Sequence, residues 1–359
     1  MNKHAKHSPA TIDDVARRAG VSVSSVSNVL NGRESRMRAD TLARVQQAIA
    51  ELKFRPNQSA RRLKLGHMPM IGLLVPSIAN PFFGTLARWV EDAAIAHGYG
   101  VLLCNTQRSA EREQEYAQAF MAQGVQGVIV GSALQAQEHL APLIRGGLAV
   151  VSFDRTAQHA DLTMDYVSLD NHRAGAMAAE HLLALGHRDI AYVSAPIRSV
   201  NRIARMEGAR EACTRAGAQF EVQFGEVPAG QVEVEMAEVG RTAALALQAK
   251  GCLSTGYVAM NDMVAIGMVA GLRQCGLRVP EDVSVVGIDD LFLGQYISPA
   301  LSTVRQPMQE MATAAVERVL ARMKNSGESP HELVFVPELV ARESTAALGL
   351  VENPRSLSA

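Results

Sequence analysis

Amide, aromatic, carboxylate and guanidinium side chains recur directly after apolar runs in the sequence downstream of residue 69. The run MIGLLV (70–75) precedes an amide and two aromatic rings, and LAVVS (148–152) precedes a carboxylate and a guanidinium. Such groups suit a sugar-like molecule, because each hydroxyl both donates and accepts a hydrogen bond. The residues that we expect to contact the ligand are Asn80, Phe82, Phe83, Asp154, Arg155, Asn171, Arg205, Asn261 and Asp289.

Simpler roles remain open for several of these polar residues. Asn171 and Asn261, with their neighbours Asp170 and Asp262, stand where helices begin and could serve only as helix caps. One of the two phenylalanines is expected to belong to the hydrophobic core. The stretch 225–241 contains no aromatic residue, which leaves the size and class of the ligand open.

Catalytic chemistry is not indicated. The sequence has no GxSxG, HExxH or CxxC motif and no glycine-rich phosphate loop. Asp154 and Asp289 could act as the acid and base of a glycoside hydrolase, but nothing in the sequence singles out that pair. The four cysteines are widely spaced, as is typical of reduced core thiols. We therefore expect no enzyme, no bound metal and no cofactor.

The elements that must position these residues alternate between strands and helices. Apolar runs predict strands at 70–75, 101–104, 127–131, 148–152, 190–194, 257–260 and 283–287. Helical patterns lie between them, around 82–97, 110–122, 138–145, 172–185, 202–216, 238–249, 262–275 and 308–323. This order predicts an α/β body of two doubly wound parallel-sheet subdomains. In such sheets, ligands bind beyond the carboxyl ends of the strands.

The first 68 residues form a separate, basic module. They carry 13 Lys and Arg against 5 Asp and Glu, whereas the remainder carries 22 against 31. Compact basic modules commonly bind phosphates. The N-terminus has no apolar stretch that could form a signal peptide, and no apolar run is long enough to span a bilayer. We therefore expect a cytoplasmic protein without membrane contact.

A helix-turn-helix is predicted within this module, over TIDDVARRAGVSVSSVSNVLNG (11–32). Thr11 and Asp14 have the spacing of a capping box, and Gly20 suits the left-handed residue that ends a helix. Ser22 is a good N-cap for the second helix, and a third helix is expected over about 39–53. A plain helical hairpin is the alternative, but the positive charge of the module favours DNA.

A short amphipathic segment follows Pro56. Asn57 can cap a helix that runs to about Lys64, with Ala60 and Leu63 on one face. A helix of about eight residues is marginal alone in water, so it needs a partner surface. An apolar side chain flanked by arginine and lysine can wedge into the minor groove of DNA. A small dimer contact is the alternative role of Leu63.

The ordered series of these motifs resembles the LacI/GalR family of bacterial transcription regulators. The resemblance covers residues 11–346 and includes DVARRAGVSVSSVSNVLNG, IGLLVPSIANPFF, VSLDNHRAG, MNDMVAIG and LRVPEDVSVVGIDD. It implies that 57–64 is a hinge helix that pairs across a dimer, with Leu63 opening the central base step. It also implies ligand contacts at Asp154, Arg205 and Asp289. The residues expected to contact DNA are Thr11, Ser22, Val23, Ser24, Ser25, Asn28, Arg33, Asn57, Ala60, Arg61, Leu63 and Lys64.

The resemblance further implies a domain plan. We expect a DNA-binding domain at 8–55, a hinge at 56–68, an effector-binding and dimerisation domain at 69–348, and a flexible tail at 349–359. Crossings near 167–169, 298–300 and 330–332 would divide the body. The N-subdomain would hold 69–167 and 299–331, and the C-subdomain would hold 168–298 and 332–348.

The function implied is that of a sequence-specific repressor controlled by a small effector, a sugar or sugar derivative. Its expected partners are a pseudo-palindromic double-stranded operator, the effector, and a second copy of the chain in a homodimer or a tetramer. The alternatives are a constitutive DNA-binding protein and a co-repressor-dependent one that responds to a nucleobase or nucleoside.

Overall fold

The computed structural model describes residues 10–30, 37–52, 54, 69–131, 134, 137–155, 164–196, 199–226, 236–251 and 254–349. The chain divides into two compact units, residues 1–68 and 69–359. No helix among the described residues has both the length and the apolar character needed to cross a membrane.

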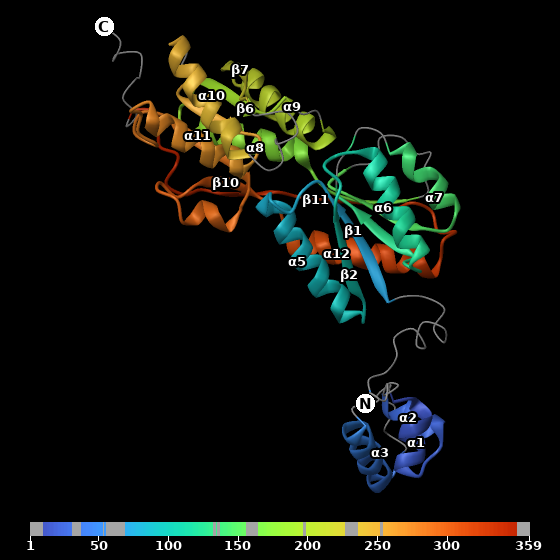
Figure 1. Ribbon diagram of the computed structural model, residues 1–359. Helices are drawn as coiled ribbons and strands as arrows, with labels where there is room; N and C mark the ends of the chain where they lie inside the picture. Colours follow the sequence, from blue (N-terminus) through green and yellow to red (C-terminus); the bar gives the residue numbers. More distant parts are fainter. Residues whose placement is uncertain are drawn as a thin grey trace, which may run out of the picture. The chain divides into compact units, whose positions relative to one another are not determined.

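The smaller unit holds the predicted helix-turn-helix, formed by α1 (Ile12–Ala19) and α2 (Val23–Leu30), and a third helix α3 (Ala39–Glu51) (Figure 1). The capping box is present, because the Thr11 hydroxyl accepts from the Asp14 amide at 3.3 Å and the Asp14 carboxylate accepts from the Thr11 amide at 3.0 Å. Gly20 ends α1 with a φ of 65°, a conformation that glycine adopts without strain.

A compact apolar core holds these three helices together. The buried residues are Val15, Ala16, Ala19, Val26, Val45, Ala48 and Phe54. Helix α3 begins after Arg38 even though that residue makes no side-chain capping bond. Packing of Val45 and Ala48 into this core therefore fixes the helix where the capping bond is missing.

The larger unit contains two sheets of six described strands each, which have the same strand order (Figure 1). In the first sheet the order is β11 (Glu332–Phe335), β5 (Asp165–Leu169), β4 (Ala149–Phe153), β3 (Gly127–Val130), β1 (Met70–Val75) and β2 (Gly100–Asn105). In the second it is β12 (Glu338–Val340), β10 (Ser302–Arg305), β9 (Ser284–Asp289), β8 (Gly256–Ala259), β6 (Asp189–Ser194) and β7 (Gln219–Phe224). All described pairings are parallel except that of β10 with β12.

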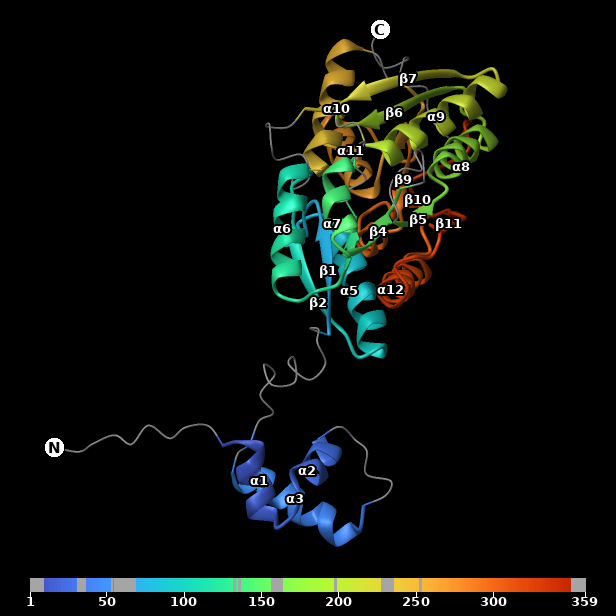
Figure 2. The ribbon, with the colours of Figure 1, turned by 90° about the vertical axis from the view of Figure 1, so that its right-hand side faces the viewer.

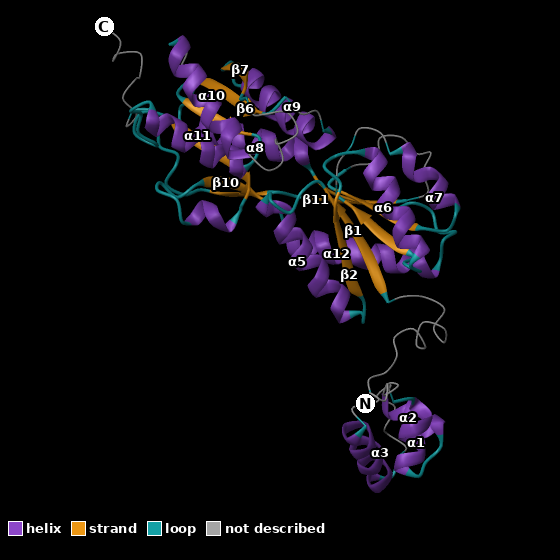
Figure 3. Cartoon of the chain, viewed as in Figure 1, coloured by secondary structure: helices purple, strands orange, loops and turns teal. Residues whose placement is uncertain are grey.

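Helices lie on both sides of these strands, as Figure 3 shows by colour. They are α5 (Pro81–Ala96), α6 (Ala110–Ala122), α7 (Ala141–Arg145), α8 (Asn171–Ala184), α9 (Val200–Arg215), α10 (Met236–Lys250), α11 (Asp262–Gln274) and α12 (Met308–Lys324). Helix α12 packs beside α5 and against β3, β4 and β5 (Figure 2). The central strands are buried on both faces, which explains their continuous apolar runs. The predicted α/β body of two doubly wound sheets is confirmed.

The pairing of the late strands corrects the predicted subdomain boundaries. The resemblance implied that 299–331 belongs to the first subdomain, but β10 pairs in register with β9 of the second sheet. It assigned 332–348 to the second subdomain, but β11 pairs with β5 of the first sheet. The chain therefore crosses between the sheets at about 170, 306–307 and 336–337. β10, β11 and β12 are only three or four residues long, so their apolar pattern does not reveal their partners.

Candidate functional site

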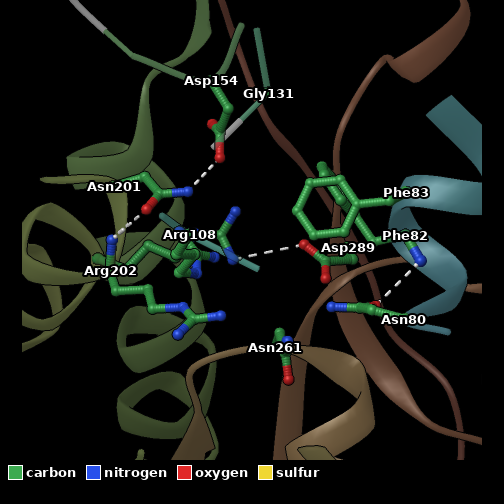
Figure 4. Close-up of a pocket in the computed structure, with 11 residues that line it drawn as sticks. Asn80, Phe82, Phe83, Arg108, Gly131, Asp154, Asn201, Arg202, Asn261 and Asp289 are labelled. Atoms are coloured by element: carbon green, nitrogen blue, oxygen red, sulfur yellow. Dashed lines mark hydrogen bonds and ion pairs between the residues drawn. The ribbon is translucent and has the colours of Figure 1, made fainter. Parts of the chain in front are cut away.

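A polar pocket lies where the carboxyl ends of strands from both sheets meet, as expected for doubly wound sheets. Asn80 and Gly131 follow β1 and β3, Asp154 follows β4, and Asp289 ends β9. Figure 4 shows side chains from both sheets converging on this pocket. Its lining residues are Asn80, Phe82, Phe83, Arg108, Gly131, Asp154, Asn201, Arg202, Arg205, Asn261 and Asp289.

Most residues predicted from the sequence to bind a ligand line this pocket. The exceptions are Arg155 and Asn171, which line an adjacent hollow that shares Asp154 and Asn201 with it. The sequence did not identify Arg108, Gly131, Asn201 or Arg202. Arg108 follows the predicted strand at 101–104, so the rule that placed Asp154 could also have found it.

Two predicted residues combine a pocket position with a capping role. Asn80 is the N-cap of α5 and accepts from the Phe82 amide at 3.1 Å. Asn261 is the N-cap of α11 and accepts from the Val264 amide at 3.0 Å. Each amide oxygen is engaged in capping, which leaves the NH₂ groups as the hydrogen-bond donors offered to a ligand.

The aromatic wall is formed by both phenylalanines. Phe82 and Phe83 are buried, and their ring centroids lie 5.1 Å apart with the planes at 87°. This edge-to-face packing is a favoured arrangement of aromatic pairs. We expected one of the two rings to belong to the hydrophobic core. In the structure both rings belong to the core, and both also line the pocket.

Arg205 is the centre of a buried hydrogen-bond network. Its Nε donates to Asn171 Oδ1 at 2.7 Å, and its Nη1 donates to the Met260 carbonyl at 3.0 Å and approaches Asp289 Oδ1 at 3.4 Å. Gln306 Nε2 also donates to that oxygen, at 2.7 Å. The two donors, Arg205 and Gln306, hold the Asp289 carboxylate in place.

A second part of the network fixes Asp154. Asn171 Nδ2 donates to Asp154 Oδ1 at 2.9 Å, and Asn201 Nδ2 donates to the other carboxylate oxygen. Asn171 thus joins Arg205 to Asp154. Although Asn171 does not line the pocket, it holds two residues that do.

Three pocket residues have backbones in the left-handed region without being glycine. The φ angles are 57° at Arg108, 58° at Asp154 and 136° at Asp289. Such conformations cost on the order of 1–3 kcal/mol each and cluster at functional sites. Their location at the ends of the strands aims these side chains into the pocket.

Two glycines set the distance between the helices that carry this network. A Cβ added at Gly175 of α8 would lie 1.8 Å from the Arg205 carbonyl oxygen, and one at Gly208 of α9 would lie 1.9 Å from the His172 carbonyl oxygen. The backbones of α8 and α9 therefore touch. This close approach allows Arg205 to reach Asn171.

Asp262 is a fully buried carboxyl group behind the pocket. It accepts from the Thr303 hydroxyl at 2.5 Å and from the Leu291 amide at 2.7 Å. Burial and the neighbouring Asp289 raise the pKa of Asp262 to about 8. Burial also raises the pKa of Asp289, although Arg205 and Gln306 oppose that shift.

Replacing Asp262 by asparagine should flatten the dependence of stability on pH. The folded protein keeps a proton on Asp262 that the unfolded chain releases above about pH 4, so stability falls as pH rises towards about 8. The slope is on the order of 1 kcal/mol per pH unit. Between about pH 6.5 and about pH 8, the melting temperature of Asp262→Asn should therefore fall less steeply than that of the wild type.

Asp282→Asn is the control for this prediction. Its partner Arg278 and its hydrogen bonds lower the pKa of Asp282, so the carboxylate is already ionised throughout that pH range. This variant should lower the melting temperature without changing its slope. Equal slopes for Asp262→Asn and the wild type would contradict the assignment.

The exposed face of α2 presents the residues that the sequence assigned to DNA. Val23, Ser24 and Asn28 are exposed, and Val26 is buried on the opposite face. Ser22 caps the helix by accepting from the Ser25 amide at 3.2 Å. Thr11 and Ser22 were also predicted to bind DNA, and both are exposed at the starts of α1 and α2. Ser25, the remaining predicted residue of this helix, is half-buried. Arg33, Asn57, Ala60, Arg61, Leu63 and Lys64 lie outside the described residues.

Comparison with known proteins gives matches to both units. Residues 11–57 match the family described as bacterial regulatory proteins, lacI family, and residues 179–345 match the family described as periplasmic binding protein-like domain. The chain is 33% identical over 343 residues to the ribose operon repressor of Haemophilus influenzae, covering 94% of this chain and 99% of that protein.

Solved structures agree with these matches. The lac repressor dimer bound to operator and the anti-inducer ONPF has a TM-score of 0.80 and 26% identity, with coverage of 95% of this chain and 100% of that one. A LacI family transcriptional regulator from Enterococcus faecium with bound ribose has a TM-score of 0.69 and 29% identity, with coverage of 78% and 99%.

Proposed function

This chain belongs to the LacI family of bacterial regulatory proteins, and from that premise we propose that it is a dimeric repressor whose operator affinity is set by a small polyhydroxylated effector. Family membership makes it a DNA-binding transcriptional regulator. The observation that carries the proposal for the effector is the polar pocket at the strand ends, with carboxylates, amides and guanidinium groups beside an aromatic wall.

Operator recognition is proposed for the exposed face of α2. In a helix-turn-helix, the second helix enters the major groove and its exposed side chains face the base edges. Val23 offers an apolar contact to a thymine methyl group, and Asn28 can pair with adenine through two hydrogen bonds. A dimer would read two half-sites about one helical turn apart, or a multiple of that distance.

Asn28→Ala should lower affinity for the operator about tenfold, because a good bidentate pair contributes about 1–3 kcal/mol of base discrimination. The operator sequence is obtained by selecting bound DNA from a random pool. Affinity for unrelated DNA at the same salt concentration should not change, since phosphate contacts dominate it. Electrophoretic mobility shifts with both DNAs measure this difference. Gln47→Ala on the exposed face of α3 is the control and should leave both affinities unchanged. Equal loss on both DNAs would contradict base readout by Asn28.

The coupling between effector and operator is proposed to run through residues 56–68. Leu63 would insert into the minor groove between flanking basic residues, and effector binding would alter how the two copies of this segment pair. The effector must then bind the two states with different affinities, typically by ~1–3 kcal/mol. Support for this route comes from the amphipathic sequence of the segment between a basic module and a ligand pocket.

A sugar-type effector is proposed from the lining of the pocket and from the ribose bound to the related Enterococcus faecium regulator. The pocket acts by binding and not by catalysis, in keeping with relatives that are named as regulators. Asp154 and Asp289 accept hydrogen bonds from neighbouring side-chain amides. These bonds fix the two carboxylates in place, where they can accept from hydroxyl groups of the effector.

Selection of bound sequences from a random DNA pool tests the proposal directly. The full-length protein should enrich a pseudo-palindrome, and repeating the selection with candidate sugars should change the yield of that sequence. A fall in yield identifies an inducer, and a rise identifies a co-repressor. Failure to enrich any sequence would contradict sequence-specific operator binding.

A further inference from the structure

Gln306 lies on one of the crossings between the two sheets and is bonded to a residue of the pocket. It follows β10 of the second sheet and precedes α12, which packs against β3, β4 and β5 of the first sheet. Gln306 is only 4% exposed, and its Nε2 donates to Asp289 Oδ1 at 2.7 Å. Gln306 is not among the residues that line the pocket, so its link to the site is the Asp289 carboxylate.

This hydrogen bond joins elements of different sheets. Asp289 is the last residue of β9 in the second sheet, and Gln306 stands two residues before Met308, where α12 begins. Helix α12 also packs beside α5, the helix that carries Phe82 and Phe83 of the aromatic wall (Figure 2). A change in the position of the Asp289 carboxylate therefore acts on the start of a helix that belongs to the first sheet.

Pro307 makes the connection between Gln306 and α12 stiff. The proline ring fixes its own φ angle and restricts the backbone of the residue before it. Pro307 occupies the N-cap position of α12, and the Gln306 carbonyl accepts from the Met308 amide at 2.8 Å. A displacement of Gln306 is thus passed to the helix instead of being absorbed by a flexible loop.

A second amide holds the other pocket carboxylate at another crossing. Asn171 directly follows the crossing at about 170 and donates to Asp154 Oδ1 at 2.9 Å. Its Nδ2 also donates to the Leu169 carbonyl at 3.2 Å, and its Oδ1 accepts from Arg205 at 2.7 Å. Both ends of the Asn171 amide are bonded, so its surroundings fix it.

The amide of Gln306 is bonded at one end only among the described residues. Its Oε1 is buried and accepts no hydrogen bond from them, an unfavourable arrangement for a polar atom inside a protein. The Asp289 oxygen that accepts from Gln306 also lies 3.4 Å from Arg205 Nη1. An effector hydroxyl that turns this carboxylate must therefore change its bond to Gln306.

We infer that Gln306 is a positioning residue that transmits occupancy of the pocket to α12, through its hydrogen bond to Asp289 and the stiff step at Pro307. This inference rests on the proposed function, since it says how the same pocket controls operator affinity. A ligand shifts an equilibrium only when it binds two states differently. The bond between Gln306 and Asp289 is the contact whose geometry differs between those states.

Gln306→Met tests this role in the full-length protein, because methionine has a similar length and cannot donate to Asp289. The operator comes from the selection experiment, and the probes are D-ribose, D-glucose, D-galactose and cellobiose. Mobility shifts give the ratio of operator affinities without and with a saturating sugar, and calorimetry gives the affinity for that sugar. Such ratios are typically about 5–150, and that of Gln306→Met should fall at least about fivefold, towards 1.

The ratio at saturation separates transmission from simple support of the site. A residue that only supports the site would lower the affinity for the sugar and leave the ratio at saturation unchanged. Gln309→Met is the control, because Gln309 is an exposed amide in the first turn of the same helix. It should keep both the ratio and the sugar affinity of the wild type.

Pro307→Gly is the second variant, and it decides the test if Gln306→Met does not fold. It keeps the Gln306 donor but loosens the step to α12. The ratio should fall while the affinity for the sugar stays close to that of the wild type. Melting temperatures show that each variant is folded.

The remaining outcomes separate this inference from the proposed function. A wild-type ratio in folded Gln306→Met, or in Pro307→Gly where only that variant folds, would overturn the inference and leave the sugar-controlled repressor standing. An equal fall in Gln309→Met would also overturn it, because any change at the start of α12 would then act alike. A wild-type protein whose operator binding responds to none of the sugars would overturn both.

Discussion

Asp289→Asn should abolish the response of operator binding to the effector while the protein stays folded. Asp289 is the last residue of β9 and lines the pocket. Its backbone has a φ of 136°, which directs the carboxylate into the pocket. Asparagine keeps one oxygen to accept from Gln306 and Arg205, but it loses the charge that strengthens hydrogen bonds to ligand hydroxyls. Sites built to bond polar groups lose binding steeply when one partner changes, so effector affinity should fall on the order of 100-fold.

Asp290→Asn is the matched control for this variant. Asp290 is the next residue, and its carboxylate pairs with Arg305 at 2.7 Å and Arg342 at 2.5 Å outside the pocket. The control should lower the melting temperature but preserve the effector response. Titration of operator complexes with a sugar that changes the yield of the selection measures both variants. A normal response in Asp289→Asn would remove this carboxylate from the effector site.

Gly175→Ala should destabilise the larger unit and weaken effector binding together. The added methyl group would lie 1.8 Å from the Arg205 carbonyl oxygen, far inside van der Waals contact, and the obstacle is backbone that cannot rotate away. Helices α8 and α9 must then separate, which should cost about 1–3 kcal/mol or more and lower the melting temperature by several degrees. The separation also pulls Arg205 Nε from Asn171 Oδ1, now 2.7 Å away.

Gly84→Ala provides the comparison for Gly175→Ala. Gly84 lies in α5, and a Cβ there would meet nothing within 4 Å. Alanine in an open helical position should stabilise the protein by roughly 0.5–1 kcal/mol, because glycine loses more conformational freedom on folding. The melting temperature should therefore fall for Gly175→Ala and rise for Gly84→Ala, and calorimetry should show weaker effector binding only for Gly175→Ala. A melting temperature of Gly175→Ala equal to that of the wild type would show that the helices can separate without cost.

Where a side chain directly follows a long apolar run, its place in the site could be predicted from the sequence. Asp154 and Asp289 follow such runs, and parallel strands end at a common edge. Asn201 and Arg202 carry no comparable signal, because they lie in the first turn of a helix whose orientation depends on packing. The role of Asn171 as the link between Arg205 and Asp154 also depends on residues far apart in the chain.

The sequence by itself determined the helix-turn-helix, the α/β rhythm and the basic charge of the first unit, because these properties depend on residues within a few positions of one another. The tertiary structure alone decided which sheet β10 and β11 join, how closely α8 approaches α9, and which three arginines share one pocket. Short strands take their partners from hydrogen bonds to distant strands. The steric requirement for glycine at positions 175 and 208 can be recognised only once the position of the opposing helix backbone is known.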